Sequence, residues 1–269
     1  MVSPLAVVDA NARIGANVIV EPFAVIHGDV EIGDNTHIHS HAVIYDGARI
    51  GAHCQIFPFV SISAVPQDLK YAGEKTTTII GDYTIVRECA TVNRGTTWLG
   101  YTKVGSHCLL MAYSHVAHDC VIGDYVIIAN SVNLAGHILI EDRVTIGGAS
   151  AVHQFVRIGA HAFISGGSLV RKDVPPFVKA AREPLSYVGV NTVGLQRRGF
   201  TPAQMLAIKE VYDILFVKTN SVRKALDLIE QEVSASKERD FIVDFITKPS
   251  RPEYNRGLMK GYSSPIEDD

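Results

Sequence analysis

Residues 25–62 read VIHGDVEIGDNTHIHSHAVIYDGARIGAHCQIFPFVSI, and every sixth residue from Ile26 onward is isoleucine. The same period of six begins at Val2 and ends at Val170, with two interruptions. Valine, isoleucine or leucine occupies all 26 of its positions outside those interruptions. An amphipathic helix repeats every 3.6 residues and a strand every two, so neither explains this pattern.

A long fixed period is typical of stacked structural units, and hexapeptide repeats indicate a β-helix. Each hexapeptide would supply a short strand and a turn. Three of them would close a triangular coil of eighteen residues, with successive coils about 4.8 Å apart. Gly15, Gly33 and Gly51 recur at that spacing, directly after an aliphatic position, and we expect them to relieve backbone strain at a corner. A sandwich of short strands is the alternative, but it would not keep one period for so long.

Bulk composition narrows the class of protein. The 269 residues suggest one or two domains, and a formal net charge of −3 argues against a nucleic-acid-binding protein, which usually carries a basic excess. The first residues lack the pattern of a signal peptide, and no apolar run is long enough to span a membrane. The four cysteines lack the paired spacing of a metal site. We therefore expect a cytoplasmic protein with reduced thiols.

Two polar segments interrupt the period, at residues 63–79 and 94–103. Both keep the later repeats in phase, so we expect loops that leave one corner of a continuous coil. Loops on a rigid scaffold often carry function, although tolerated surface insertions would look the same. Prolines in DVPP stop the strand pattern soon after Val170. The sequence therefore predicts a coil domain over 1–186, followed by a connector and a helical domain over 187–269.

The spacing of apolar residues becomes helical in the carboxyl-terminal part. Residues 201–204, TPAQ, form the capping-box pattern of a helix start, and Ser221 and Ser236 are predicted to cap two further helices. We expect these helices to cover the last coil, whose strand edges would otherwise be open. Residues 248–269 are polar and contain Pro and Gly, and we expect them to be loosely held.

Counting in coils of eighteen residues brings four of the eleven histidines together on one edge: His115, His118, His137 and His153. His118 would lie directly below Gly136, which would lie below Gln154. Asp119 would lie directly below His137. A single histidine is usually a polar surface residue, but a vertical cluster beside a loop predicts a functional site.

Three kinds of function suit such a cluster. Neutral His118 could take a proton from a hydroxyl group, with Asp119 fixing its tautomer and the Gly136 N–H stabilising an oxyanion. Histidines could instead hold zinc, as in γ-carbonic-anhydrase-like hexapeptide proteins, although the spacing here differs from theirs. A structural or binding solenoid is the third possibility, but it would need neither the clustered histidines nor the loop at 63–79.

Several short motifs occur in order along the chain: QDLKYAGE at 67–74, NRGT at 93–96, TKVG at 102–105, AHDC at 117–120, LAGH at 134–137, IGG at 146–148, HQF at 153–155, DVPP at 173–176, and GVN with RRGF within 189–200. Together they closely resemble the UDP-N-acetylglucosamine O-acyltransferases that begin lipid A synthesis in Gram-negative bacteria. The similarity covers nearly the whole chain and weakens after about residue 220. QDLKYAG with AHDC and LAGH is much more specific than hexapeptide repeats alone.

The resemblance implies a mainly β fold, a left-handed parallel β-helix with a carboxyl-terminal α-helical domain, assembled as a homotrimer. The family transfers an (R)-3-hydroxyacyl group from acyl carrier protein to the 3-hydroxyl of UDP-N-acetylglucosamine, without a metal or organic cofactor. It implies that His118 is the general base, that Asp119 orients it, and that Gly136 is the oxyanion donor.

The resemblance also implies contacts to the sugar nucleotide or acyl chain for ten residues: Gln67, Asp68, Lys70, His115, His137, His153, Gln154, Asn191, Arg197 and Arg198. Arginine suits a diphosphate because its planar fork binds oxygens bidentately. Gly166 matches the position that limits acyl length, and glycine there predicts a long chain. Asn93 stands where some members have His and Val193 where some have Glu, so details of nucleotide binding stay open.

Two related activities also stay open. The later N-acyltransferase of the same pathway acts on a UDP-amino sugar and carries an additional amino-terminal domain, whereas here the period begins at Val2. A sugar N-acetyltransferase that uses coenzyme A is a more distant alternative.

Overall fold

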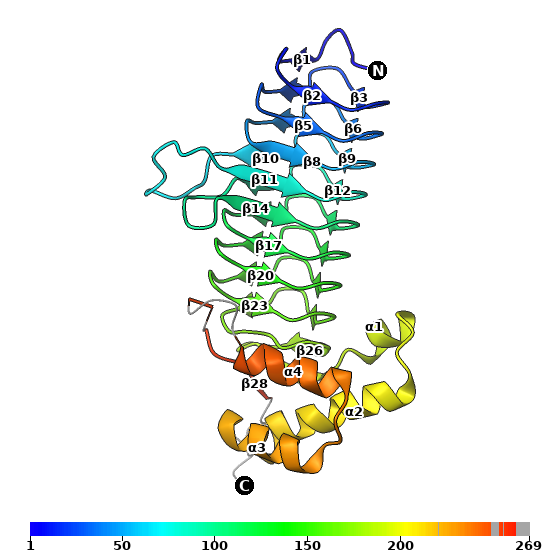
Figure 1. Ribbon diagram of the computed structural model, residues 1–269, viewed down its shortest axis with the longest axis vertical. Coiled ribbons are helices and arrows are strands. Elements are labelled where there is room, and N and C mark those ends of the chain that lie inside the picture. The colour runs from blue at the N-terminus through cyan, green and yellow to red at the C-terminus, as the bar shows by residue number, and fades with distance from the viewer. Residues whose placement is uncertain (220, 249–252, 255, 262–269) are drawn as a thin grey trace.

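The computed structural model describes residues 1–219, 221–248, 253–254 and 256–261. Stacked coils form a tall triangular prism, and helices pack at the carboxyl-terminal end of it (Figure 1). The predicted fold class, a parallel β-helix of hexapeptide repeats followed by helices, is confirmed. The division into domains at 186/187 stays a prediction.

Three parallel sheets form the faces of the prism. The first face contains β1 (Val7–Val8), β4 (Val25–Ile26), β7 (Val43–Ile44), β10 (Ser61–Ala64), β13 (Thr91–Asn93), β16 (His115–Val116), β19 (Asn133–Leu134), β22 (Ala151–Val152) and β25 (Leu169–Val170). The second face contains β2 (Arg13–Ile14), β5 (Glu31–Ile32), β8 (Ala48–Ile50), β11 (Thr77–Ile80), β14 (Tyr101–Val104), β17 (Val121–Ile122), β20 (Leu139–Ile140) and β23 (Arg157–Ile158). The third face contains β3 (Ile19–Val20), β6 (His37–Ile38), β9 (Gln55–Ile56), β12 (Ile85–Val86), β15 (Leu109–Leu110), β18 (Ile127–Ile128), β21 (Thr145–Ile146), β24 (Phe163–Ile164) and β26 (Val178–Ala181).

The period of six supplies the core. Residues on it point inward and stack on the equivalent residue of the next coil, as Ile26 does on Ile44. Both side chains are buried, as are nearly all later members of the series. Val2, at the open amino-terminal end, is 48% exposed because no coil lies below it. Stacking of branched side chains explains why the pattern tolerates little besides Val, Ile and Leu.

The role expected for the repeated glycines is wrong. The corner residues with left-handed backbone are not these glycines but residues two positions later, such as Asn17 and His53. Gly33 instead lies against the backbone of the next coil, where a Cβ atom would approach Ala52 N to 2.6 Å. These glycines are therefore needed for the close approach of coils.

Both predicted loops leave the corner between the first and second faces. Residues 65–76 connect β10 to β11, and residues 94–100 connect β13 to β14 (Figure 1). Paired strands of the first face are 18 residues apart at β7 and β10, 30 at β10 and β13, and 24 at β13 and β16. The loops therefore add twelve and then six residues without changing the register of the coils.

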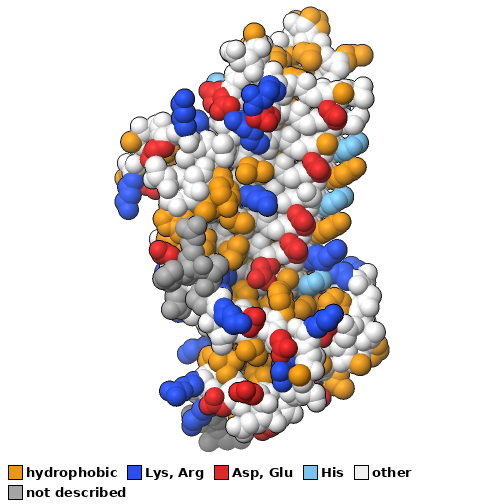
Figure 2. All heavy atoms as spheres, viewed as in Figure 1, with side chains coloured by type: hydrophobic (Ala, Val, Ile, Leu, Met, Phe, Trp, Pro, Cys, Tyr) orange, Lys and Arg blue, Asp and Glu red, His pale blue; other side chains and the backbone are white. Residues whose placement is uncertain are grey.

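Aromatic and histidine side chains stack along the corner between the second and third faces. The rings of His53, Tyr83, His107 and Tyr125 follow one another at centroid distances of 4.6 to 4.9 Å. Figure 2 shows a ridge of alternating histidine and hydrophobic side chains along one edge of the prism. The regular coil spacing places equivalent corner residues one above another.

The helices begin where their capping residues predict. They are α2 (Pro202–Asp213), which continues into the π-helical η1 (Ile214–Lys218), α3 (Val222–Glu232) and α4 (Lys237–Thr247). Thr201 forms a full capping box, and Ser221 and Ser236 cap α3 and α4. The Tyr212 hydroxyl of α2 donates to the carbonyl of Pro176 at 2.5 Å. The helices therefore pack directly on the last coil, as expected.

Two parts of the chain differ from expectation. The polar connector contains the antiparallel strand β27 (Ser186–Val190) and the short helix α1 (Thr192–Arg197). Helix α1 has only about one and a half turns, too few for a helical period to be visible in the sequence. Within the carboxyl-terminal stretch, β28 (Lys260–Gly261) pairs with β27, and Met259 and Tyr254 are buried. This part is held against the coil; residues 249–252, 255 and 262–269 lie outside the described residues.

Every helix in the described part of the chain is too short or too polar to cross a membrane.

Candidate active site

His118 lies just after β16, at the corner between the first and second faces where both loops emerge. Its ring is largely buried, and Nδ1 lies 2.8 Å from Oδ2 of Asp119. Because a carboxylate can only accept, Nδ1 carries the proton and donates. Nε2 therefore presents a lone pair, which is the arrangement that a general base requires.

Asp119 is completely buried and is anchored by the loop 94–100. Its carboxylate accepts hydrogen bonds from the Thr96 backbone N–H at 3.0 Å, the Thr96 hydroxyl at 2.7 Å and the Leu99 N–H at 3.2 Å. Its own backbone N–H donates to the Thr102 hydroxyl at 2.8 Å. Burial alone would raise the pKa of Asp119, but the hydrogen bonds from His118 and Thr96 outweigh burial and hold the pKa below its ordinary value.

Thr96 and Thr102 were missed by reasoning from the sequence. Eighteen-residue counting fails across an inserted loop, so nothing in the period places Thr96 beside Asp119. Their motifs, NRGT and TKVG, were the signal that could have found them.

Gly136 lies directly above His118, as counting by coils predicts. A Cβ atom at this position would lie 2.6 Å from Cε1 and 2.8 Å from Nε2 of the His118 ring. Any larger residue would therefore displace the imidazole. Among the described residues nothing accepts a hydrogen bond from the Gly136 N–H, so this donor is free beside the nitrogen of His118 that bears the lone pair.

Aromatic rings form the wall next to His118. The ring of His137 stacks on Phe155 at 4.5 Å and meets the edge of Trp98, also at 4.5 Å. Burial lowers the pKa of His137, and the neighbouring carboxylate of Asp119, 3.8 Å away, only partly offsets this. A cavity of about 240 Å³ is lined by His137, Phe155 and residues of both loops. They include Trp98 from the loop 94–100 and Asp68 and Lys70 from the loop 65–76.

The other residues predicted on this corner lie close to the same column. The Nδ1 atom of His115 lies 2.7 Å from the Thr91 hydroxyl, and burial followed by the charge of His118 lowers its pKa. His153 and Gln154 are exposed in the coil above, and Gln67 is exposed at the base of the loop 65–76. The structure therefore brings the histidine column and the first loop together.

The carboxyl-terminal segment reaches this corner, which the sequence did not indicate. The Arg256 guanidinium donates to the carbonyl of Gln154 at 2.9 Å and lies over the ring of Phe155. The buried ring of Tyr254 lies 6.0 Å from that of Trp98. A contact between residues about a hundred positions apart leaves no periodic signal.

The remaining predicted residues lie elsewhere in the same chain. Asn191, Arg197 and Arg198 line a cavity of about 490 Å³ between the third face and α1, with Lys179 opposite. Burial followed by the charge of Arg143 lowers the pKa of Arg198, whose Nη1 has no partner among the described residues. This cavity therefore has a concentration of positive charge suited to an anion.

Asn191 has a structural role in addition to any contact with a ligand. Its side-chain oxygen accepts from the Gly194 N–H and caps α1, and its side-chain nitrogen donates to the carbonyl of His161 at 2.9 Å. Val193, one of the two departures from the family pattern, is 58% exposed and lines the same cavity. Asn93, the other departure, is buried and donates to the carbonyl of Val65 at the start of the first loop.

Gly166 follows β24 and lies at the corner between the third and first faces. A Cβ atom there would lie 3.0 Å from the carbonyl of Gly148, and the adjacent Gly167 has a φ of +71°. The third face lies opposite the corner of His118 in a triangular prism. One chain therefore does not bring Gly166 or the arginines to the histidine column.

Two clusters have suitable donor atoms for a metal ion among the described residues. One consists of His118, Asp119 and His137, and the other of Glu21, His37 and His39. In the first cluster, Asp119 already receives several hydrogen bonds and only two histidines take part. A zinc site of three histidines is therefore not formed at this corner by a single chain.

Comparison with known proteins identifies the family. Residues 173–259 match the family model described as UDP N-acetylglucosamine O-acyltransferase, domain 2, and residues 11–46 and 101–136 match the bacterial transferase hexapeptide model. The chain is 50% identical over 267 residues to the acyl-(acyl-carrier-protein)–UDP-N-acetylglucosamine O-acyltransferase of Chlorobaculum parvum, covering 98% of this chain and 99% of that protein. The enzyme of the same name from Myxococcus xanthus is 43% identical over 198 residues, covering 73% of this chain and 77% of that protein.

Solved structures agree with the sequence comparison. The crystal structure of Francisella novicida UDP-N-acetylglucosamine acyltransferase superposes with a TM-score of 0.92 at 40% identity, over 99% of this chain and 95% of that one. The similarity thus extends over both the coils and the helices. The chain belongs to the acyl-(acyl-carrier-protein)–UDP-N-acetylglucosamine O-acyltransferase family and is an acyltransferase.

Proposed function

We propose that this protein transfers an (R)-3-hydroxyacyl group from the thioester of acyl carrier protein to the 3-hydroxyl of UDP-N-acetylglucosamine, the first step of lipid A synthesis. The names of its relatives support the two substrates. The observation that carries the proposed mechanism is the hydrogen bond between His118 and Asp119 below Gly136.

His118 acts as the general base. Its Nε2 atom takes the proton of the sugar 3-hydroxyl while the hydroxyl oxygen attacks the thioester carbonyl carbon. Asp119 keeps the proton on Nδ1 and stabilises the imidazolium that forms. The low pKa of Asp119 keeps this carboxylate charged throughout. The thiolate of the carrier then leaves and receives the proton from the imidazolium, which restores the neutral base.

The Gly136 N–H stabilises the oxyanion of the tetrahedral intermediate. The absence of a side chain lets the imidazole and the substrate carbonyl approach the backbone together. Such a donor is effective because it is oriented before the reaction begins. Glycine at this position thus serves both the packing of the base and the chemistry.

The loop 65–76 and the neighbouring coils hold the sugar and the acyl chain. Asp68, Lys70 and His137 line the cavity of about 240 Å³, and His115, His153, Gln154 and Gln67 surround the same corner. A sugar hydroxyl group needs several polar partners in fixed directions, which coils and a loop can supply together.

A neighbouring chain completes the site in a homotrimer. Arg197, Arg198 and Asn191 contact the nucleotide, and Gly166 faces the acyl chain, but all four lie away from His118 in their own chain. The third face of one copy can be placed against the His118 corner of the next. Cyclic symmetry would then build three equivalent sites.

One assay tests the reaction and separates it from related ones. The purified protein is incubated with UDP-N-acetylglucosamine and 3-hydroxyacyl carrier proteins of several lengths, and products are identified by mass. An O-acylated sugar nucleotide that forms only with carrier-bound donors is expected. Acylation of an amino sugar nucleotide instead, or use of acetyl coenzyme A, would replace the proposal with one of the two N-acyltransferase activities.

A further inference from the structure

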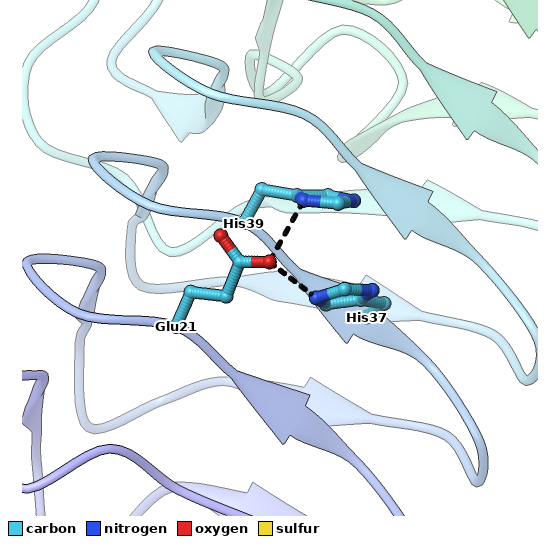
Figure 3. A group of neighbouring side chains, drawn as sticks. All are labelled: Glu21, His37 and His39. Atoms are coloured by element: carbon cyan, nitrogen blue, oxygen red, sulfur yellow. Dashed lines mark hydrogen bonds and ion pairs between the residues drawn. The ribbon is translucent and has the colours of Figure 1, made fainter.

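A second histidine cluster lies on the amino-terminal coils, well away from His118 along the prism. It consists of Glu21, which follows β3, His37, which begins β6, and His39, which follows β6 (Figure 3). Glu21 and His39 are eighteen residues apart and thus occupy the same position in successive coils. His37 and His39 are two residues apart and project from the same side of the strand.

The carboxylate of Glu21 faces the edges of both rings (Figure 3). Its Oε1 atom lies 2.8 Å from Nε2 of His37 and 3.1 Å from Nδ1 of His39. Its Oε2 atom accepts from the backbone N–H and the hydroxyl of Ser40, each at 3.0 Å. Ser40 therefore fixes the orientation of the carboxylate. The other carboxylate oxygen points towards both imidazoles (Figure 3).

The imidazole rings are also fixed in place. The ring of His37 stacks on that of His39 at 3.9 Å, and His39 stacks on Phe57 at 4.6 Å. The three side chains are between 20% and 31% exposed, so solvent still reaches the cluster. One nitrogen of each ring and one carboxylate oxygen thus converge, with open positions for water.

We propose that Glu21, His37 and His39 form a binding site for a divalent transition-metal ion, with zinc as the best-suited ion. Two imidazoles and one carboxylate are a common donor set for such ions, and three protein ligands leave room for water or a further ligand. The three donor atoms lie within 4.8 Å of one another, so small side-chain rotations bring them to coordinating distance. Ser40 supplies the outer hydrogen bonds that orient a ligating carboxylate.

The site would link two coils near the open end of the prism. Glu21 belongs to one coil and both histidines to the next, so a bound ion adds a cross-link at the end where the core is least covered. The second ring nitrogen of His39 has no partner among the described residues. Because ligating histidines usually donate their other N–H to an acceptor, we expect micromolar rather than tighter binding.

Calorimetric titration of the metal-free full-length protein with zinc chloride tests the site. Wild type is compared with Glu21→Gln, His37→Gln and His39→Gln, and with His53→Gln as a matched exposed histidine elsewhere. We expect one zinc ion per chain at this site, weakened about tenfold or more in the first three variants and unchanged in His53→Gln. When zinc is absent, the melting temperatures of the first three variants should match that of wild type. When zinc is present, they should be lower than that of wild type.

His118→Ala distinguishes this site from the catalytic corner, which also offers metal-binding atoms. The same binding event should persist in His118→Ala, and anomalous diffraction from zinc-soaked crystals should place the ion among Glu21, His37 and His39. Loss of the event in His118→Ala would overturn the proposal, as would titrations that superimpose for wild type and His39→Gln. An absence of zinc binding by wild type would overturn it equally.

Discussion

At the scale of single residues, the proposed chemistry depends on the protonation of one imidazole, that of His118. Asp119 receives hydrogen bonds from His118, Thr96 and Leu99, so its position is set before substrate binds. The proton of His118 consequently lies on the buried nitrogen, and the lone pair faces the space beside Gly136. The aliphatic residues of the period of six are not part of this arrangement, so His118 can be replaced without changing the core of the coil.

His118→Ala is expected to lower kcat by roughly a hundred- to ten-thousand-fold, the usual contribution of a general base. The fold should be retained, because the inward-pointing residues of the coil are unchanged, and the melting temperature should fall only by the loss of one hydrogen bond to Asp119. Steady-state kinetics with saturating substrates measure the effect, and His53→Ala provides a control at an exposed histidine. A loss below about tenfold would remove His118 from the role of base.

Chelation separates base catalysis from metal catalysis at the same corner. Dialysis against EDTA should leave the turnover of wild type unchanged, because the proposed reaction moves its proton through His118 alone. Inactivation that zinc reverses in both wild type and His39→Gln, which lacks the amino-terminal metal site, would instead favour a metal ion held by His118, Asp119 and His137.

At the scale of elements, the loop 94–100 supports the proposed catalytic dyad of His118 and Asp119. The Thr96 hydroxyl and backbone N–H both bind the buried carboxylate of Asp119. A hydrogen bond to a charged group is worth about 1.5–3 kcal/mol. The loop therefore contributes to stability and to the position of the proposed base, which a tolerated surface insertion would not do.

Thr96→Val is expected to destabilise the protein by about 1–3 kcal/mol at neutral pH and to lower kcat. Loss of the hydroxyl should bring the pKa of Asp119 closer to its ordinary value of 3.8. A depressed carboxyl pKa stabilises the fold above the unfolded-state pKa, and this contribution is lost as pH falls through the folded-state pKa. The difference from wild type in denaturant unfolding should thus be largest at neutral pH and shrink below about pH 4.

Thr97→Val is the matched control, since Thr97 is the exposed neighbour in the same loop. It should leave the free energy of unfolding close to that of wild type; the comparison is made on stability because Thr97 also lines the cavity of about 240 Å³. Equal effects of the two substitutions would mean that the loop responds to any change of composition and that the bond to Asp119 has no special role.

At the scale of the whole molecule, the two groups of proposed site residues lie on different sides of one prism. The histidine column is at the corner between the first and second faces, whereas Arg197 lies over the third face. If both groups serve one site, only assembly of chains can bring them together. The proposed site is then a property of the oligomer, and loss of a residue in one chain should be complemented by another.

A mixture of His118→Ala and Arg197→Ala chains should therefore regain activity when the two are unfolded and refolded together. If each site takes His118 from one chain and Arg197 from its neighbour, random assembly at equal amounts leaves about a quarter of sites intact. Activity of the refolded mixture, with trimers verified by light scattering, measures this. No recovery from trimeric mixtures would place each site within one chain.

Gly166 is expected to set the length of the acyl chain. Glycine leaves the groove open, so wild type should prefer long 3-hydroxyacyl donors, and Gly166→Met should shift the preference to shorter ones. Each buried methylene contributes about 0.8 kcal/mol, so excluding four would cost roughly 3 kcal/mol. Competition between donors of different length measures the ranking.

Gly166→Ala serves as the graded comparison in that experiment. A Cβ atom there meets the carbonyl of Gly148 at 3.0 Å, so both variants share that strain and only methionine fills the groove. Alanine should change the ranking little. If methionine also keeps the wild-type ranking, the acyl groove runs elsewhere.

The sequence by itself determined the coil, its inward-facing residues, the corner from which both loops emerge and the column of His118, Gly136 and His137. The physical reason is that parallel coils stack in register, so residues eighteen positions apart must become neighbours. The capping residues of the helices could also be predicted, because a cap depends only on residues within one turn.

Only the tertiary structure decided the contacts that do not follow that count. The inserted loop resets the spacing, so the bond of Thr96 to Asp119 appears only once the loop is folded. The contact of Arg256 with Gln154 joins distant segments, and packing alone places it. The position of Arg197 on the far side of the prism depends on where β27 and α1 turn after the last coil, which no repeat specifies.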